Sequence, residues 1–239
     1  MHQVNLLITG AAHGMGAAFA RYAYDKLNND VNADNVHNIY LLDKDLMDVG
    51  IFDREEKCKV FFYYCNVEFE KSFPQISHVT HLFNNAGIQL PTRQYDDNVI
   101  DTNLKGLIKC TETYALNNDD IKAVLNQASV SAHSGSEFPN YVASKGGVLA
   151  YTKAIANQLA PKAICNSISF GGVTTSLNDQ VMNNKDKWNR IMEVTPMKKW
   201  VTLDEASKWI WFLLFENKSM TGQDVIVDNG EIINSTFVW

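Results

Sequence analysis

The sequence predicts an α/β fold in which buried parallel strands alternate with helices. Residues 4–9 form a short, nearly continuous apolar run, as expected for a parallel strand that is buried on both faces. They lead directly into a glycine-rich loop at 10–16 and then into a helical segment at 17–27. Six further strand-length apolar runs follow, at 39–45, 59–67, 78–87, 121–129, 162–169 and 223–230.

Length and composition are those of one globular domain. The chain has 239 residues, 46% of them hydrophobic and 20% charged, and no internal repeat or linker, so we expect a single domain over residues 1–239. A net charge of −6 gives no basic footprint for nucleic acid or an anionic membrane. The N-terminus predicts no signal peptide, and the longest apolar run, 209–215, is too short to span a bilayer. The four scattered cysteines fit a reducing, cytoplasmic location.

The glycine loop predicts a phosphate-binding turn. Between the first strand and the first helix, the backbone of Gly10, Gly14 and Gly16 can approach a pyrophosphate, and the helix N-terminus offers unpaired N–H groups. The first two glycines are one residue further apart than in the Gly-x-Gly-x-x-Gly fingerprint, so a simple glycine turn stays the alternative.

An acidic residue ends the second strand. In a dinucleotide-binding fold, a carboxylate at the position of Asp43 accepts hydrogen bonds from the adenosine ribose and repels a 2′-phosphate. Asp43 therefore favours NAD over NADP, although Lys44 is its neighbour, and a merely solvated aspartate is the alternative. The polar loop at 28–38 accounts for its distance from the glycines.

Polar residues stand at the ends of the next two predicted strands and within the helix that follows them. Asn66 and Val67 leave the third strand, where an adenine ring could lie, and the fourth strand ends in the Asn-Asn-Ala-Gly sequence 84–87. A long helix is predicted from about 92 to 116, interrupted by Asn103 and Gly106. His78 and His81 have no third ligand in register, so no metal site is expected.

Ser129, Tyr141 and Lys145 are the candidate chemical groups. Ser129 ends the fifth strand, and on a helix Lys145 lies about 6 Å along the axis from Tyr141, on the same face. An ammonium so close lowers the pKa of the phenol toward the range in which it exchanges protons. Tyrosine and lysine fall four apart on many helices by chance, so the pair gains meaning only from its context.

The C-terminal third is predicted to contain a flap and a capped helix. Residues 176–200 mix Leu177, Met182, Trp188 and Met192 with polar residues, which indicates a helical flap over a substrate or, equally, a short helix facing the core. Residues 202–205 fit a capping box that opens a helix through Phe215.

Taken together, these pieces resemble the classical short-chain dehydrogenase/reductase family over essentially the whole chain. The resemblance rests on seven motifs in the family's order: 9–16, 84–87, Asn103 to Gly106, Ser129, Tyr141 to Lys145, 171–175, and 221–228. It implies a doubly wound Rossmann sheet of seven parallel strands in the order 3-2-1-4-5-6-7, between helices on both faces. It also implies a nicotinamide cofactor and hydride transfer between a secondary alcohol and a ketone.

The resemblance also implies a role for each motif residue. Tyr141 would be the general acid/base, Lys145 would lower its pKa and hold the nicotinamide ribose, Ser129 would bind the substrate oxygen, and Asn103 would hold a water in a proton relay. The cofactor-binding residues would be Gly10, His13, Gly14, Met15, Gly16, Asp43, Asn66, Val67, Asn84, Ala86, Gly87, Tyr141, Lys145, Gly171, Val173 and Thr175.

Three positions depart from the family pattern. Phe170 stands where proline is usual, and Asn66 stands where aspartate is frequent. The segment from Ser129 to Tyr141 is one residue shorter than expected, which leaves Ser131 as a weaker candidate for the serine. His13 occupies a position where NADP-preferring relatives often carry arginine, which again favours NAD.

The resulting expectation is an NAD(H)-dependent oxidoreductase that acts on a small-molecule alcohol or ketone. The alternatives are an enzyme similar to 3-oxoacyl-carrier-protein reductases, which would need a basic landing patch, and a non-catalytic dinucleotide sensor on the same fold. The small residues of the Tyr141 helix and the apolar tail 237–239 predict a homodimer or homotetramer.

Overall fold

The computed structural model describes residues 3–30, 35–52, 57–90, 97–136 and 138–233. Its centre is one seven-stranded sheet in the order β3-β2-β1-β4-β5-β6-β7, and every neighbouring pair is parallel. Each predicted strand is present, so the predicted fold class and strand order are confirmed. The strands are β1 (Asn5–Thr9), β2 (His37–Asp43), β3 (Cys58–Tyr64), β4 (His81–Asn84), β5 (Ala123–Gln127), β6 (Ile164–Phe170) and β7 (Asp224–Val227).

The order of the strands determines where a ligand can bind. The chain runs outward from β1 to β3 and then returns to β4, which pairs with β1 on the other side. The connections after β1 and β4 therefore diverge above the carboxyl ends of the strands and leave a crevice there.

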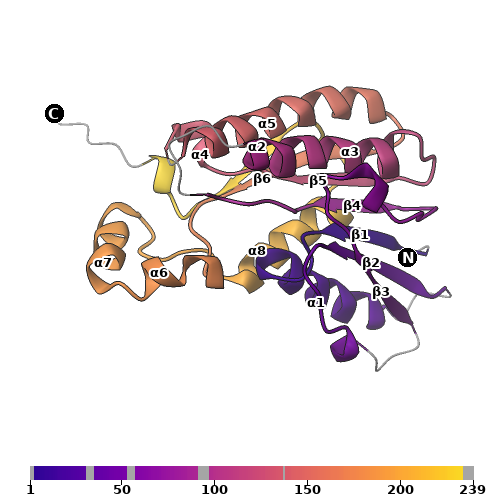
Figure 1. Cartoon of the computed structure of the whole chain (residues 1–239), viewed down its shortest axis with the longest axis horizontal. Coiled ribbons are helices and arrows are strands. Elements are labelled where there is room, and N and C mark those ends of the chain that lie inside the picture. The colour runs from indigo at the N-terminus through magenta and orange to yellow at the C-terminus, as the bar shows by residue number, and fades with distance from the viewer. Residues whose placement is uncertain (1–2, 31–34, 53–56, 91–96, 137, 234–239) are drawn as a thin grey trace.

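Helices cover both faces of the sheet (Figure 1). On one face lie α1 (Gly14–Asn28) and α8 (Leu203–Trp211), which contact each other closely. On the other face lie α5 (Pro139–Leu159) and a helix that runs through residues 97–116. The predicted capping box of α8 is present, because Thr202 Oγ1 accepts from Glu205 N at 3.2 Å and Glu205 Oε2 accepts from Thr202 N at 3.0 Å.

The helix at 97–116 is irregular where Asn103 and Gly106 were expected to interrupt it. It begins as α2 (Asp97–Ile100), continues as a π-helical segment (Asp101–Gly106), and then forms α3 (Leu107–Thr111) and a second π-helical segment (Glu112–Leu116). The predicted start at 92–96 lies outside the described residues.

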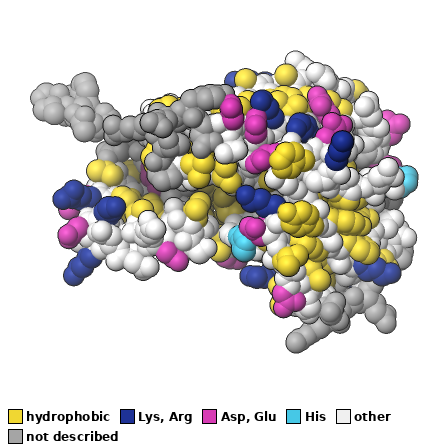
Figure 2. Space-filling model, viewed as in Figure 1, with side chains coloured by type: hydrophobic (Ala, Val, Ile, Leu, Met, Phe, Trp, Pro, Cys, Tyr) yellow, Lys and Arg dark blue, Asp and Glu magenta, His cyan; other side chains and the backbone are white. Residues whose placement is uncertain are grey.

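The crossover from β3 to β4 contains only a 3-10 turn (Glu70–Ser72) among its regular elements. Among the described residues, no helix consequently covers one face of β2 and β3. Tyr40 and Phe61 stack there with ring centroids 5.5 Å apart, and Phe61 remains 38% exposed. Figure 2 shows hydrophobic side chains gathered over this part of the sheet.

The C-terminal third holds the segments around the crevice. A short α4 (Ser131–Ser134) follows β5, and α6 (Asp179–Met182) and α7 (Lys185–Val194) lie in the predicted flap. Figure 1 shows α6 and α7 projecting beyond the sheet on the side of the crevice. The apolar tail 237–239 lies outside the described residues.

Candidate active site

Two cavities open at the carboxyl ends of the strands. The first, of about 300 Å³, is lined by the glycine loop and by the residues that follow β2, β3 and β4. The second, of about 210 Å³, is lined by Ser129, Tyr141 and the segment that follows β6. Met15, Thr175 and Leu177 border both cavities, so the two form one continuous candidate site.

The glycine loop approaches β4 more closely than a side chain would allow. Gly10 has a φ of +64°, and a Cβ there would lie 2.7 Å from the Cα of Ala86. Asn85 holds the two segments together, because its Nδ2 donates to Gly10 O at 2.8 Å and its backbone N donates to Thr9 Oγ1 at 3.0 Å. The loop thus presents a narrow backbone cradle of the kind that a pyrophosphate requires.

Four of the five predicted loop residues line the first cavity, namely Gly10, His13, Gly14 and Met15. Gly16 does not, because it lies beneath the loop, where a Cβ would be 2.1 Å from Gly10 O. The absence of a side chain at Gly16 lets α1 pack closely against the loop, and contact of Gly16 with the cofactor stays a prediction.

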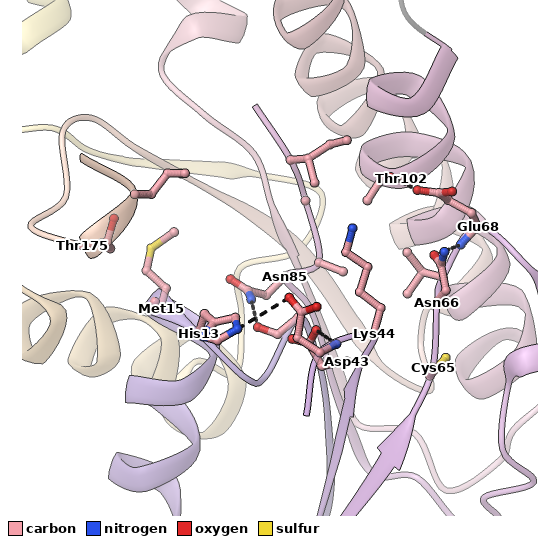
Figure 3. A pocket seen from close by; sticks show the side chains of 18 of the residues that line it. His13, Met15, Asp43, Lys44, Cys65, Asn66, Glu68, Asn85, Thr102 and Thr175 are labelled. Atoms are coloured by element: carbon pink, nitrogen blue, oxygen red, sulfur yellow. Dashed lines mark hydrogen bonds and ion pairs between the residues drawn. The ribbon is translucent and has the colours of Figure 1, made fainter. Parts of the chain in front are cut away.

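Asp43 lies at the predicted end of β2 and is 9% exposed. Its Oδ2 accepts from Ala12 N at 2.8 Å and its Oδ1 accepts from Asp45 N at 2.9 Å. The carboxylate therefore fixes the glycine loop against β2 and lines the cavity beside it. Figure 3 shows Lys44 extending its side chain into the same space, and His13 Nε2 lies 3.5 Å from Asp45 Oδ2.

Asn66 and Val67 line the far end of the first cavity, and their contact with adenine stays a prediction. Asn66 Oδ1 accepts from Glu68 N at 3.1 Å, so its side chain shapes the turn after β3. Glu68 and Thr102, which the sequence did not single out, also line this end, and the Thr102 hydroxyl donates to Glu68 Oε1. They are 34 positions apart and belong to different elements, so no local sequence pattern joins them.

Not all of the predicted residues in the Asn-Asn-Ala-Gly turn at 84–87 line the cavity. Ala86 and Gly87 line the first cavity as expected, together with Asn85. Asn84 is only 2% exposed, and its Nδ2 donates to Thr111 Oγ1 and Asn126 Oδ1, both at 2.9 Å. The expectation that Asn84 lines the cleft is wrong, because its side chain points into the core between β4 and β5.

Tyr141 and Lys145 occupy the first turns of α5, which begins with Pro139 at a favourable N-terminal position. Lys145 Nζ lies 5.7 Å from the centroid of the Tyr141 ring and donates to Gln127 O at 2.8 Å. Lys145 is 3% exposed, and burial lowers the pKa of its ammonium to about 8. The structure therefore brings the pair together at the end of β5, with the lysine inside the wall and the tyrosine on the second cavity.

Ser129 lines the second cavity together with Tyr141. Ser129 Oγ accepts from Ser131 Oγ at 2.9 Å and from Ser131 N at 3.2 Å. These two bonds leave the Ser129 hydroxyl hydrogen to point toward a ligand. Ser131 is 1% exposed and supports Ser129 from behind.

Asn103 is fully buried in the π-helical segment. Its Oδ1 accepts from Ile88 N at 2.7 Å, and its Nδ2 donates to Ile88 O at 2.9 Å and to Ser144 Oγ at 3.2 Å. Both amide hydrogens are thus used by protein partners, so the side chain clamps the segment that follows Gly87, and a relay water at Asn103 stays a prediction. A Cβ at Gly87 would lie 3.5 Å from Lys145 Nζ. The segment that the Asn103 side chain holds therefore runs next to the lysine.

The segment after β6 borders the second cavity. Gly171, Val173 and Thr175 line it, together with Phe170, and their contact with a cofactor stays a prediction. Of the four apolar flap residues, Leu177 is 71% exposed and lines both cavities. Trp188 packs edge-on against Trp200 with ring centroids 5.0 Å apart, while Met182 and Met192 are not among the lining residues.

Neither histidine near β4 belongs to a metal-binding cluster. His78 Nδ1 lies 2.6 Å from Asp120 Oδ2, and the His81 ring stacks on Phe215. Burial lowers the pKa of His81 to about 3. Within the part of the chain that the structure describes, no group of three or more metal-ligating side chains comes together.

The family model described as "Enoyl-(Acyl carrier protein) reductase" matches residues 61–231. The chain is 28% identical to the 3-oxoacyl-(acyl-carrier-protein) reductase FabG of Staphylococcus epidermidis, over 94% of this chain and 97% of that relative. Two solved structures share the fold at 22% identity. One is a putative 2-deoxy-d-gluconate 3-dehydrogenase from Agrobacterium tumefaciens with bound NADP, with a TM-score of 0.81 and 98% of each chain covered. The other is a 4-hydroxyisoleucine dehydrogenase complexed with NADH, with a TM-score of 0.80 over 98% of this chain and 100% of that one.

Proposed function

The chain belongs to the short-chain dehydrogenase/reductase family of oxidoreductases, and from that premise we propose that it interconverts a secondary alcohol and a ketone with NAD(H). The observation that carries the proposal is that Ser129 and Tyr141 line one cavity wall, with Lys145 buried beside Tyr141 and with Val173 and Thr175 lining the same cavity. Nothing in dinucleotide sensing alone requires a buried lysine next to a tyrosine, so the sensor alternative is disfavoured.

The first cavity fits a nicotinamide dinucleotide. Its floor is the glycine cradle, where a Cβ at Gly10 would collide with Ala86. Gly10, Gly14 and Met15 would hold the pyrophosphate, Asp43 the adenosine ribose, and Asn66 and Val67 the adenine. Val173 and Thr175 would hold the nicotinamide end, where the bound cofactor supplies or accepts a hydride.

Tyr141, Ser129 and Lys145 would control the protonation of the substrate oxygen. In the reductive direction, the Tyr141 hydroxyl would donate a proton to the carbonyl oxygen, while the Ser129 hydroxyl donates a hydrogen bond to the same atom. The Lys145 ammonium would stabilise the phenolate that remains. Asn103 would act as a positioning residue, because it fixes the backbone of Ile88 next to Lys145.

NAD is the proposed cofactor because carboxylates outnumber cations around the adenosine end. Asp43, Asp45 and Glu68 line that end of the cavity, against Lys44 and the exposed His13. A 2′-phosphate would carry about two further negative charges into this acidic surrounding. Tighter binding of NADPH than of NADH in a fluorescence titration would overturn this preference.

A 3-oxoacyl-carrier-protein reductase is the second candidate, since the relative named above carries that name. A carrier protein needs a basic landing surface, whereas this chain has a net charge of −6 and an acidic cavity mouth. We therefore place it second. Within the described residues no helix is long and apolar enough to cross a membrane, and a cytoplasmic location stays part of the proposal.

The experiment that tests the proposed function is the substitution Tyr141→Phe. We expect turnover of NADH with ketones to fall by more than a thousandfold, because the phenolic proton donor is lost while the ring remains. NADH affinity, measured by fluorescence titration, should stay within about twofold. Unchanged turnover in Tyr141→Phe would refute the assignment.

A further inference from the structure

The short helix α4 follows Ser129 closely and is attached to the sheet at both of its ends. At its start, Val130 N donates to Phe170 O at 3.2 Å. At its other end the His133 ring reaches β7, where His133 Nε2 lies 2.8 Å from Asp224 Oδ2. Figure 1 shows α4 beside α5, and the two helices are in contact. A helix of one turn is not stable on its own, so these contacts determine the position of α4.

The Asp224 carboxylate is the centre of a polar cluster that joins β6, β7 and α4. Its Oδ2 accepts from His133 Nε2, because a carboxylate oxygen can only accept, and its Oδ1 accepts from Ser167 Oγ at 2.6 Å. Ser169 Oγ lies 3.3 Å from the same nitrogen of His133. These four residues form the α4 anchor.

The register of the sheet brings the α4 anchor together. Ser167 pairs with Asp224 across β6 and β7, and Ser169 lies two residues further along β6, so it faces the same side. Ser167 and Ser169 are 1% and 0% exposed, and the side chains of His133 and Asp224 are 26% and 13% exposed. The carboxylate is thus largely buried and receives one donor on each oxygen, unlike a solvated surface ion pair, which contributes little to stability.

Serine, histidine and aspartate also form the nucleophilic triads of hydrolases, but the α4 anchor has a different geometry. In a triad the serine and the carboxylate bind to different nitrogens of the imidazole, so that one nitrogen can take the serine proton while the carboxylate holds the other. Here Ser169 Oγ and Asp224 Oδ2 both lie at Nε2 of His133. None of the four residues is among the described residues that line the two cavities. The geometry therefore fits the holding of α4 and not nucleophilic catalysis.

Ser131 lies between the two attachments of α4 and directs the Ser129 hydroxyl. Its Oγ and its backbone N donate to Ser129 Oγ at 2.9 and 3.2 Å. These two bonds occupy the acceptor positions of the Ser129 oxygen and leave its hydrogen for a ligand in the cavity that Tyr141 also lines. If the attachment at His133 is lost, α4 can turn about Val130, and Ser131 then moves relative to Ser129.

We propose that His133 and Asp224 are positioning residues for the alcohol–ketone chemistry: they hold α4, and through Ser131 they hold the Ser129 hydroxyl against the substrate oxygen. The inference rests on the proposed oxidoreductase function and adds remote residues to it. Neither side chain touches the reacting atoms, so both act on turnover only through Ser129. Misplacement of a catalytic group by about 1 Å can reduce the rate by about a hundredfold.

The test measures kcat of His133→Ala with NADH and the ketone that the wild type turns over fastest. We expect kcat to fall at least about tenfold, because the Ser129 hydroxyl no longer holds the substrate oxygen in line with Tyr141. NADH affinity in a fluorescence titration should stay within about twofold, because the α4 anchor does not line the first cavity. His133→Gln keeps a side-chain N–H that can donate to Asp224 and should recover most of the lost kcat.

Three further variants separate positioning from stability. In a Ser129→Ala background, His133→Ala should lower the residual kcat by less than about twofold, because the hydroxyl through which it acts is already absent. Asp224→Asn keeps one of the two acceptor oxygens and should give an intermediate kcat, and it replaces His133→Ala in the comparison if His133→Ala does not fold. Asp120→Ala is the matched control, because it removes the carboxylate of the exposed His78–Asp120 pair outside both cavities and should leave kcat unchanged.

The possible failures are distinguishable. A wild-type kcat in the variants of the α4 anchor, with or without a lower melting temperature, would overturn the positioning role and leave the oxidoreductase function standing. An equal loss of kcat in the presence and the absence of the Ser129 hydroxyl would do the same. No oxidation of NADH by the wild type with any ketone would refute the proposed function, and the inference with it.

Discussion

The buried charge of Lys145 lowers the stability of the fold, whereas the proposed chemistry requires it. It is 3% exposed, it donates to Gln127 O, and burial lowers its pKa to about 8. A shift from 10.5 to about 8 means that the charged form is unfavourable inside the fold by about 3 kcal/mol. A buried group whose pKa is shifted in this way, next to a cleft, is a candidate functional residue.

Lys145→Met should therefore stabilise the protein and inactivate it. At pH 7 we expect the free energy of unfolding to rise by up to about 3 kcal/mol, because the variant no longer buries a cation. Turnover should fall at least a hundredfold, since nothing then stabilises the Tyr141 phenolate. Urea unfolding and steady-state kinetics measure the two effects, and Lys59→Met, at an exposed position of β3, is the control that should change neither.

The pH dependence of stability follows from the same shift. The folded-state pKa of about 8 lies below the unfolded value of 10.5, so the unfolded state binds more protons between these pH values. Wild-type stability should receive from Lys145 a contribution that rises with pH across this window, and Lys145→Met should lack it. Identical pH slopes in the two proteins would contradict the buried-charge account.

Residues close together in the sequence were predictable, and those that meet only in the fold were not. Tyr141 and Lys145 are one helical turn apart, so their proximity follows from helix geometry alone. Glu68 and Thr102, or Gln127 and Glu231, come from separate elements, and no spacing rule joins them. The core position of Asn84 depends on Thr111 and Asn126, which the strand pattern alone does not reveal.

At the scale of elements, the irregular helix at 97–116 connects the proposed cofactor cavity to the residues proposed to transfer the proton. Its first π-helical segment places Asn103 against Ile88 and places Gly106 against Val67. The sequence predicted an interruption at these two residues but not its π-helical form, because that form depends on contacts with Ile88 and Val67 from other segments.

Gly106→Ala tests whether this helix shapes the adenine end. A Cβ at Gly106 would lie 2.6 Å from Val67 Cγ2 and 3.2 Å from Val67 O, so Val67 must shift. We expect NADH affinity to fall by about tenfold, although alanine favours helix by up to about 1 kcal/mol. Thr113→Ala, at an exposed position of the same helix, should leave NADH affinity unchanged, and equal affinity of all three proteins in a fluorescence titration would exclude the coupling.

At the scale of the whole molecule, α5 presents a smooth outer face. Ala143, Ala150 and Ala154 are exposed, and a Cβ at Gly146 would meet nothing within 4 Å. Gly147 belongs to the inner face, since a Cβ there would lie 2.6 Å from Leu104. A face of small residues allows the close approach of another helix, and this supports the proposal of a homodimer or homotetramer.

Gly146→Glu should shift the protein toward a smaller assembly, because the added carboxylate would be buried between the helices of two subunits. Light scattering at micromolar concentration measures the mass of the wild type and the variant. Gln75→Glu adds the same charge at an exposed loop position and serves as the control. A monomeric mass for the wild type would refute the assembly itself.

The layers of the molecule were predictable because each strand and helix carries its own hydrophobic pattern. The bare sheet face above Tyr40 and Phe61 was not predicted, because it results from a crossover of β3 to β4 without a helix. Whether residues 1–239 form a single domain with a flap at 176–200 stays a prediction, which limited proteolysis would examine.

The central claim is hydride transfer between a bound nicotinamide cofactor and a ketone in the cleft that contains Tyr141. The most direct measurement uses NADH that carries deuterium at the transferable position, with the ketone turned over fastest, followed by mass spectrometry and NMR of the alcohol product. The account predicts one deuterium on the carbinol carbon, and loss of labelled product in Tyr141→Phe. An unlabelled alcohol, or equal label transfer by Tyr141→Phe, would contradict it.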